Sequence, residues 1–273
     1  GTRDILPPDQ SWSECECPLG CNTQNQGWAG GPINTRSGNY HYNQEDVSIP
    51  ALGGSLRFER SYNSWAVAYN GNRPSVLGYG WTHNYDMDLT FPEDIGGEPG
   101  TVIVKGCRGS RFRFKDNGDG TFTPLPGILA ELTRTLSAPY TYTLTGVDQS
   151  IYIFGEDGRL TEIRDPRGHA IHLLYNESGQ LVRVEDVTGQ RFLEFSYNDR
   201  GLLTEVRDPI RRTVQYAYDD EENVLIVVTD TRGLPWTFSY GDRLWLSEGE
   251  ERPLLTGIYN PMGQQVEETW YCN

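Results

Sequence analysis

The sequence predicts an all-β protein, and three observations lead to this prediction. Short segments alternate between apolar and polar residues, which is the period of a strand with one buried face. The chain of 273 residues is rich in β-forming aromatics, with 16 tyrosines and 7 tryptophans, and in turn formers, with 31 glycines and 16 prolines. An aromatic residue also returns at a nearly constant interval in the second half of the chain, which indicates a repeat architecture.

The recurring aromatic residues define the repeat, and we call them the aromatic ladder. They follow one another at steps of 21, 22, 21, 22 and 19 residues: Phe154, Tyr175, Tyr197, Tyr218, Tyr240 and Tyr259. Glycines shortly after the first three indicate a turn there: Gly158, Gly179 and Gly201. A second turn halfway through each unit has the Asp, Pro and Gly pattern of a type I turn: Asp165-Pro-Arg-Gly168, Asp186-Val-Thr-Gly189, Asp208-Pro-Ile-Arg211 and Asp230-Thr-Arg-Gly233.

The two strands of each unit differ in pattern. The strand after the Asp turn alternates cleanly, as in Val214, Tyr216 and Tyr218. The other strand places its apolar residues three apart, as in Leu181 and Val184. A β-bulge or a strand buried on both faces would produce this spacing, and the sequence does not choose between them.

These phrases resemble the YD repeat of the RHS/YD-repeat family. The shared pattern is an aromatic residue, Gly and Leu around the first turn, followed by Asp-Pro-x-Gly in the second, and it covers residues 151–260. The resemblance implies a β-sheet that winds as a spiral into a hollow shell. Two units depart from the pattern, because Asp219-Asp-Glu-Glu-Asn223 lacks the glycine and the unit that begins at Tyr240 is shortened.

Residues 31–91 carry a second resemblance, to the N-terminal domain that begins the shell in RHS proteins. Four phrases carry it in order: Gly31-Pro-Ile-Asn-Thr-Arg-Ser-Gly-Asn-Tyr40, Asp46-Val-Ser-Ile-Pro50, Leu56-Arg-Phe-Glu-Arg-Ser-Tyr-Asn-Ser64 and Leu77-Gly-Tyr-Gly-Trp-Thr-His-Asn-Tyr85. We expect Arg60, Tyr62, Trp81 and His83 in these phrases to pack and to bond turns rather than to form an active site.

The predicted architecture has three parts. Residues 1–30 form an extended N-terminal arm with cysteines and prolines, 31–150 form an RHS N-terminal β domain, and 151–273 form a YD-repeat β-spiral, an open shell of antiparallel strands and hairpins. A short helix is expected around Leu129–Leu136. The stretch Asp116-Asn-Gly-Asp-Gly-Thr121 is predicted to be a hairpin turn and not a calcium loop, because Lys115 and Pro126 stand where ligands are required.

The charge of the chain argues against nucleic acid as a partner, and its apolar pattern argues against a membrane span. The net charge is −15 and the pI about 4.7, so the protein repels phosphate backbones and is not expected to bind nucleic acid. There is no run of about 18 apolar residues, and no membrane span is expected. The opening Gly1-Thr-Arg-Asp4 also lacks the features of a signal peptide.

The cysteines favour disulfides and an oxidising compartment. There are five candidates, with three clustered near the N-terminus: Cys15, Cys17, Cys21, Cys107 and Cys272. Their spacing fits no standard zinc pattern, while an odd count is typical of an intermolecular bond or one free thiol. The sequence leaves the pairing open and predicts a secreted or cell-surface protein.

No constellation in the sequence supports catalysis, a cofactor or a metal. Nucleophile-elbow, zinc-protease and phosphate-loop motifs are absent. His169 and His172 lie three apart on a predicted strand and point to opposite faces, which does not suit a shared metal. The prediction is a protein that is not an enzyme and uses no cofactor.

The function predicted first is structural. A few repeats leave exposed strand edges, which invite pairing between copies, and the cysteine-bearing arm would lock such contacts. We therefore expect self-assembly into an extracellular tube, fibre or sheath, with other copies of the chain as partners. The alternatives are the N-terminal shell portion of a larger RHS toxin-delivery protein, which the family resemblance implies, and a carbohydrate-binding surface module with glycans as partners.

Overall fold

The computed structural model describes residues 28–29, 33–34, 39–52, 54–69, 74–92, 99–245 and 251–271. These residues form long, open, antiparallel sheets, and within them α1 (Ala66–Tyr69) is the single α-helix. The prediction of an all-β fold is therefore confirmed. The predicted arm at 1–30 falls outside the described residues, apart from strand β1 (Trp28–Ala29).

Two compact units divide the chain, and neither is continuous in sequence. The first combines residues 1–25 with 86–169, and the second combines 26–85 with 170–273. The predicted division at 30/31 and 150/151 thus differs from the compact units. The physical reason is that strands from residues 39–83 pack onto the repeats of residues 170–273, as described below.

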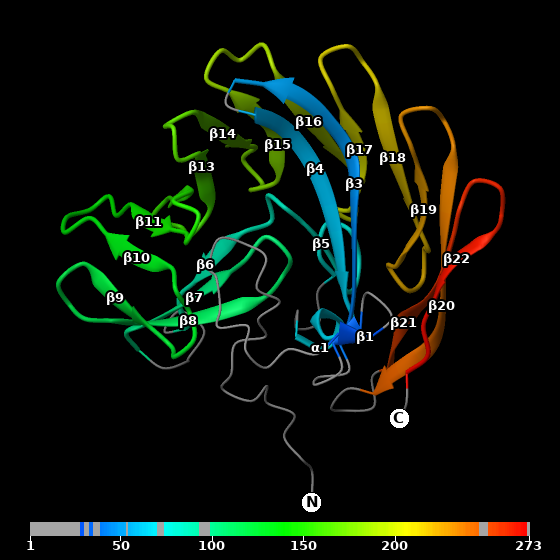
Figure 1. Ribbon diagram of the computed structural model, residues 1–273, viewed down its shortest axis with the longest axis horizontal. Coiled ribbons are helices and arrows are strands. Elements are labelled where there is room, and N and C mark those ends of the chain that lie inside the picture. The colour runs from blue at the N-terminus through cyan, green and yellow to red at the C-terminus, as the bar shows by residue number, and fades with distance from the viewer. Residues whose placement is uncertain are drawn as a thin grey trace, which may run out of the picture. The chain divides into compact units, whose positions relative to one another are not determined.

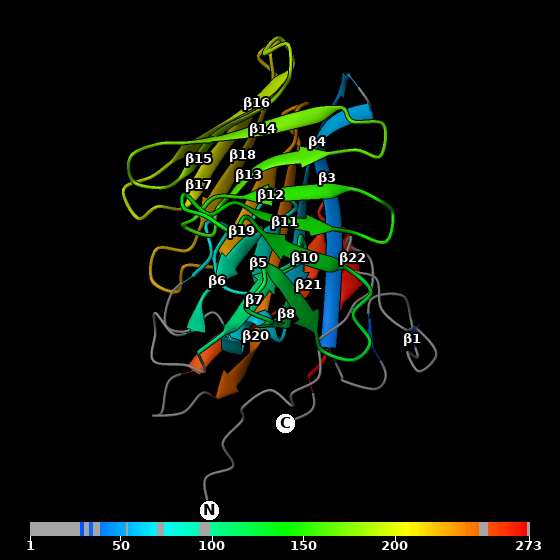
Figure 2. The same cartoon turned by 90° about the vertical axis from the view of Figure 1, so that its left-hand side faces the viewer.

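The first unit is a run of strands, each antiparallel to the next, which Figure 2 shows as neighbouring ribbons from β10 to β13. Apolar residues of alternating positions form its core, such as Val104, Phe114 and Leu144. Its strands are β6 (Asp88–Thr90), β7 (Thr101–Lys105), β8 (Arg111–Asp116), β9 (Thr121–Pro124), β10 (Glu131–Arg134), β11 (Tyr142–Thr145), β12 (Ile151–Phe154) and β13 (Leu160–Arg164).

The helix expected around Leu129–Leu136 is wrong, since this segment contains strand β10. Only one side of the segment is buried: Leu132 is 1% exposed, whereas Leu129 and Leu136 are 61% and 79% exposed. β10 pairs with both β9 and β11, and these sheet contacts decide its conformation. The stretch Asp116–Thr121 is the predicted hairpin turn between β8 and β9.

The second unit combines two sheets. A five-stranded sheet joins β1, β2 (Ile33–Asn34), β3 (Asn39–Ala51), β4 (Gly54–Asn63) and β5 (Trp81–His83). The repeats supply β14 (Ala170–Tyr175), β15 (Leu181–Asp186), β16 (Phe192–Tyr197), β17 (Leu203–Arg207), β18 (Thr213–Tyr218), β19 (Leu225–Thr229), β20 (Pro235–Trp245), β21 (Glu251–Tyr259) and β22 (Gln265–Glu268). Figure 1 shows β3 and β4 beside β16 and β17, and Phe58 contacts Phe195 across the two sheets, with ring centroids 5.6 Å apart.

A β-bulge recurs after each turn of the aromatic ladder. Tyr175 pairs with Leu181 but Leu174 pairs with Arg183, so one residue of β15 is left without a partner in the register. The same shift follows Phe154, Tyr197 and Tyr218. The bulge turns two residues three apart toward the same face, which is why Leu181 and Val184 are both buried. Of the two explanations that the spacing left open, the structure shows the bulge.

The turns are closed by Asx side chains and by one residue with positive φ. Asp165 Oδ1 accepts the backbone N–H groups of Arg167 and His169, and Gly168 has φ +87°. Where the glycine is missing, Arg211 and Asn223 adopt φ of 67° and 54°. The two turns without a glycine therefore keep the backbone geometry at the cost of strain, roughly 1 kcal/mol each.

Gly80 combines positive φ with close approach to the core. A Cβ there would lie 2.5 Å from Tyr62 Cε2 and 2.8 Å from Val67 Cγ2, and both side chains are fully buried. We expect Gly80→Ala to lower the free energy of unfolding by about 2–3 kcal/mol, from overpacking added to backbone strain. Urea denaturation measures this. Gly233→Ala is the matched control, since Gly233 has φ +80° with nothing within 4 Å, and equal losses in the two variants would contradict the steric argument.

Candidate functional site

A buried ion pair lies between the two sheets of the second unit. Arg60 Nε donates to Oδ1 and Oδ2 of Asp46 at 3.0 and 2.9 Å, and Tyr216 Oη donates to Asp46 Oδ2 at 2.9 Å. The side chains of Arg60 and Asp46 are 1% and 4% exposed. Strands β3 and β4 supply the ion pair and β18 supplies the tyrosine. The contact therefore joins the five-stranded sheet of β1 to β5, which we call the N-terminal sheet, to the repeats.

A bulge in β3 aims Asp46 into the core. Glu45 pairs with Glu59 and Val47 with Phe58, so Asp46 stands outside the register. An extra residue of this kind redirects its side chain, and here it brings the carboxylate to the face where Arg60 lies. Burial raises the pKa of Asp46, while the charge of Arg60 and the hydrogen bond from Tyr216 oppose the rise.

The guanidinium of Arg60 is also held by aromatic rings. Its Cζ lies 5.0 Å from the ring centroid of Trp81 and 4.9 Å from that of Phe238. Trp81 is fully buried, and its Nε1 donates to Tyr240 Oη at 2.9 Å. The four residues of the N-terminal phrases expected to pack are indeed buried, with exposed fractions from 0% to 4%: Arg60, Tyr62, Trp81 and His83.

The ladder tyrosines bond the backbone of the preceding repeat. Three of them, and also Tyr271, donate a hydroxyl hydrogen bond to a leucine carbonyl 15 or 16 residues earlier: Tyr197 to Leu181, Tyr218 to Leu203, Tyr240 to Leu225 and Tyr271 to Leu255, at 2.6–2.9 Å. Burial raises the pKa of Tyr218 and of Tyr240, so both hydroxyls keep the proton that they donate. The ladder thus joins successive repeats through hydrogen bonds.

Tyr197, Tyr218 and Tyr240 lie toward one end of the repeat strands, which we call the ladder end, and the structure places Tyr259 at the opposite end. Tyr259 pairs with Gln265 across the Asn260–Gly263 turn, which occupies the position of the Asp turns, whereas Tyr240 pairs with Leu255 at the ladder end. Tyr271, which the spacing did not reveal, makes the ladder contact instead. The long hairpin of β20 and β21 separates Tyr240 from Tyr271 and breaks the interval. Phe154 is fully buried in the first unit, and Tyr175 is half-buried at the end of β14.

The hydroxyl of Tyr240 has two partners, which makes this residue a sensitive test. Tyr240→Phe removes the acceptor for Trp81 Nε1 and the donor to the Leu225 carbonyl, so two polar groups lose a partner in the core. We expect a loss of about 2 kcal/mol in the free energy of unfolding. Tyr259→Phe serves as the control and should change stability by less than about 0.5 kcal/mol. A thermal or urea melt compares the two, and a larger loss from Tyr259→Phe would contradict the assignment.

His41 makes stability depend on pH. It lies in β3 at 6% exposure, and burial lowers its pKa from 6.5 to about 4. The folded state therefore binds fewer protons than the unfolded state between these values, and stability falls as the pH drops through that window. We expect a loss of about 2 kcal/mol between pH 7.5 and pH 5. Urea midpoints measured across this pH range compare wild type with His41→Gln. The stability of the wild type should fall more steeply as the pH drops.

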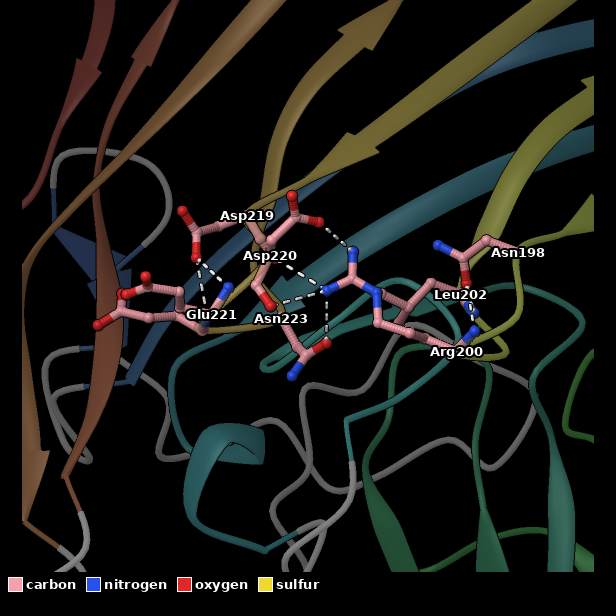
Figure 3. Close-up of polar contacts among 8 residues, drawn as sticks. Asn198, Arg200, Leu202, Asp219, Asp220, Glu221 and Asn223 are labelled. Atoms are coloured by element: carbon pink, nitrogen blue, oxygen red, sulfur yellow. Dashed lines mark hydrogen bonds and ion pairs between the residues drawn. The ribbon is translucent and has the colours of Figure 1, made fainter.

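Arg200 bridges two neighbouring turns at the ladder end of the strands (Figure 3). Its Nη1 donates to the carbonyls of Asp219 and Asp220 and to Asn223 Oδ1, at 3.1–3.3 Å, and its Nη2 contacts Asp220 Oδ1 at 3.1 Å. The bridge covers the turn that lacks glycine. Asp220 is 95% exposed, so this contact is screened and stabilises the turn only weakly.

The remaining predicted site residues are mostly outside the described part. Cys107 lies half-buried in the turn between β7 and β8, while Cys15, Cys17, Cys21 and Cys272 fall outside the described residues. The disulfide prediction therefore stays a prediction. Within the described ranges no group of His, Cys, Asp or Glu is arranged to hold a metal ion, and no helix is long and apolar enough to cross a membrane.

The fold and this site define a class of protein: a β-hairpin repeat protein whose N-terminal strands are built into the core of its repeats. Comparison with known proteins finds two families that each match part of the chain. The family described as Domain of unknown function (DUF6531) matches residues 30–114, and the family described as RHS Repeat matches residues 197–233. Residues 197–233 therefore match an RHS repeat, which supports the resemblance of the chain to the RHS/YD-repeat family.

Curated relatives extend this result. The chain is 28% identical over 180 residues to the "tRNA3(Ser)-specific nuclease WapA" of Bacillus spizizenii, and equally similar to the "tRNA nuclease WapA" of Bacillus subtilis. The matched stretch is 66% of this chain but 7% of each relative. The chain therefore spans a small fraction of the length of the relatives it matches. Proteins of the RHS-repeat family are typically extracellular or at the cell surface.

The comparisons correct one prediction. The absence of catalytic motifs led us to expect a protein that is not an enzyme, and the names of the relatives contradict this, because they are tRNA nucleases. Nothing in these 273 residues indicated nuclease activity, because they carry none of the catalytic motifs named above. The relatives also favour the toxin-delivery alternative over the self-assembling tube, fibre or sheath.

Proposed function

We propose that the chain is the N-terminal shell portion of a larger RHS toxin-delivery protein that is secreted or displayed at the cell surface. One observation carries the proposal. The two family matches occur in the order of an N-terminal domain followed by a repeat, in a chain that aligns with 7% of relatives named as tRNA nucleases. The whole protein would deliver a nuclease of this kind.

The core of the second unit supports a role at the start of a shell. The N-terminal sheet contacts particular repeats through particular side chains: Asp46 accepts from Tyr216, and Trp81 donates to Tyr240. The backbone N–H of Leu255 also donates to Tyr62 Oη at 3.0 Å. Such contacts give the repeat array a defined register from its first strands.

The test uses the native protein. An antibody raised against the 273-residue chain should detect, in the source cells, a protein much larger than 30.9 kDa. Immunoprecipitated material should degrade tRNA in vitro, and a precipitate made with a non-immune antibody is the control. A native protein of about 31 kDa, with tRNA left intact by the precipitate, would contradict the proposal. Glycan binding stays a prediction that the same purified protein can test on an array.

A further inference from the structure

The two ends of the repeat strands in the second unit carry opposite exposed charge. The Asp turns follow β15, β17 and β19, the Asn260–Gly263 turn follows β21, and Figure 1 shows these loops one after another along one side of the repeats. The aspartates that close two of these turns are hidden, with Asp186 and Asp208 at 2% and 1% exposure. The arginines beside them are exposed, and we call this end the arginine rim: Arg191, Arg211, Arg212 and Arg232. Arg212 and Arg232 form ion pairs with Asp208 and Asp230 of their own turns, at 2.7 and 2.6 Å, so the positive charge of the rim comes mainly from Arg191 and Arg211.

Apolar side chains stand exposed on the same rim. Val187, Ile210 and Met262 are 52%, 71% and 81% exposed at the tips of their turns. Leu52, at the tip of the β3–β4 hairpin, is 53% exposed, and its backbone bonds Asp186. Turn tips in water are usually polar, and a row of apolar tips flanked by one sign of charge is typical of an interaction surface.

The opposite end of the strands is acidic. The turns there follow β14, β16 and β18, and their exposed acids define the acidic rim: Glu177, Asp199, Asp220 and Glu221. Arg200, in the turn after β16, is engaged by Asp220 and by the carbonyls of the neighbouring turn (Figure 3), and Arg243 of β20 pairs with Glu222. The acidic rim therefore presents negative charge along the same row of hairpins that presents positive charge at its other end.

We propose that the arginine rim is a docking surface for a second copy of this chain, which contributes its acidic rim in a head-to-tail contact. The charges are complementary in this orientation only, since like rims repel. The spacing is also matched, because both rims belong to the same strands and successive turns lie about 10 Å apart on each. Closing the contact removes the exposed valine, isoleucine and methionine tips from water, which adds an apolar contribution.

This contact differs from the edge-to-edge pairing expected from the sequence. It uses the turns and leaves the strand edges aside, and it is heterologous, with a different surface on each copy. It also opposes the general repulsion between chains of net charge −15, so it should weaken steeply with added salt. The inference does not depend on the proposed function.

A charge-swap experiment on the whole 273-residue chain tests the contact. Sedimentation velocity in low salt, about 20 mM, should show reversible association of wild type that disappears at about 500 mM. The variants Arg191→Glu/Arg211→Glu and Glu177→Arg/Glu221→Arg should each associate roughly tenfold more weakly. Mixing the two variants should restore association, because the reversed acidic rim of one fits the reversed arginine rim of the other.

A matched control separates rim charge from net charge. Glu131→Arg/Glu268→Arg changes the net charge as the acidic-rim variant does, but at exposed strand positions away from the rims, so it should associate at least as well as wild type. Circular dichroism of each variant verifies the fold. A monomeric wild type in low salt would overturn the proposal, and so would a mixture of folded variants that fails to associate.

Discussion

Asp46→Ala is expected to lower the free energy of unfolding by about 3–5 kcal/mol. The change leaves the guanidinium of Arg60 without its counter-charge at 1% exposure, and it removes the acceptor of Tyr216 Oη. An unpaired charge in the core costs far more than a lost surface contact. Urea denaturation followed by tryptophan fluorescence is the measurement, since Trp81 lies beside Arg60.

A double-mutant cycle tests whether the effect comes from the pair. Once Asp46 is alanine, Arg60→Met should destabilise little or even restore stability, because it removes the buried unpaired charge. The exposed pair of Arg243 and Glu222 supplies the comparison, and Glu222→Ala should cost less than about 1 kcal/mol. Equal losses from Asp46→Ala and Glu222→Ala would show that the buried pair does not join the two sheets as described.

Trp81→Ala is expected to cost about 4–5 kcal/mol, as a large cavity in the core does. Trp81 is fully buried, and its ring centroid lies 5.2 Å from that of Tyr62 and 5.3 Å from that of Phe238. The substitution also removes the face on which Arg60 rests. Trp270→Ala is the control, since Trp270 is 77% exposed and should change stability by less than about 0.5 kcal/mol. A thermal melt of both variants measures the two losses of stability.

The repeat was predictable from the sequence because its signals are local. Each turn begins with an Asx residue whose side chain accepts backbone N–H groups and has a positive-φ glycine as its fourth residue, and both recur at fixed offsets around Asp165 and Asp230. The alternation of Val214, Tyr216 and Tyr218 likewise indicated the buried face that the structure shows. The three-residue spacing was visible but ambiguous, since a bulge is a property of strand pairing and requires the partner strand.

The site was not predictable, because it depends on contacts between distant segments. Asp46 and Tyr216 are 170 residues apart, and nothing in the phrase around Asp46 indicates that a bulge turns its carboxylate inward. Tyr271 was missed because an interval was used where strand direction decides which tyrosines share an end. Counting turns from Tyr240, with one long hairpin allowed, would have found it.

The long hairpin of β20 and β21 has a consequence for how such chains can change in length. Tyr271 comes 31 residues after Tyr240, yet its hydroxyl bonds the Leu255 carbonyl as Tyr240 bonds that of Leu225. The extra residues of β20 and β21 lie between these two tyrosines in the sequence and leave both ladder hydrogen bonds in place. A foreign peptide or a whole small domain inserted between Trp245 and Glu251 should therefore also leave both hydrogen bonds in place.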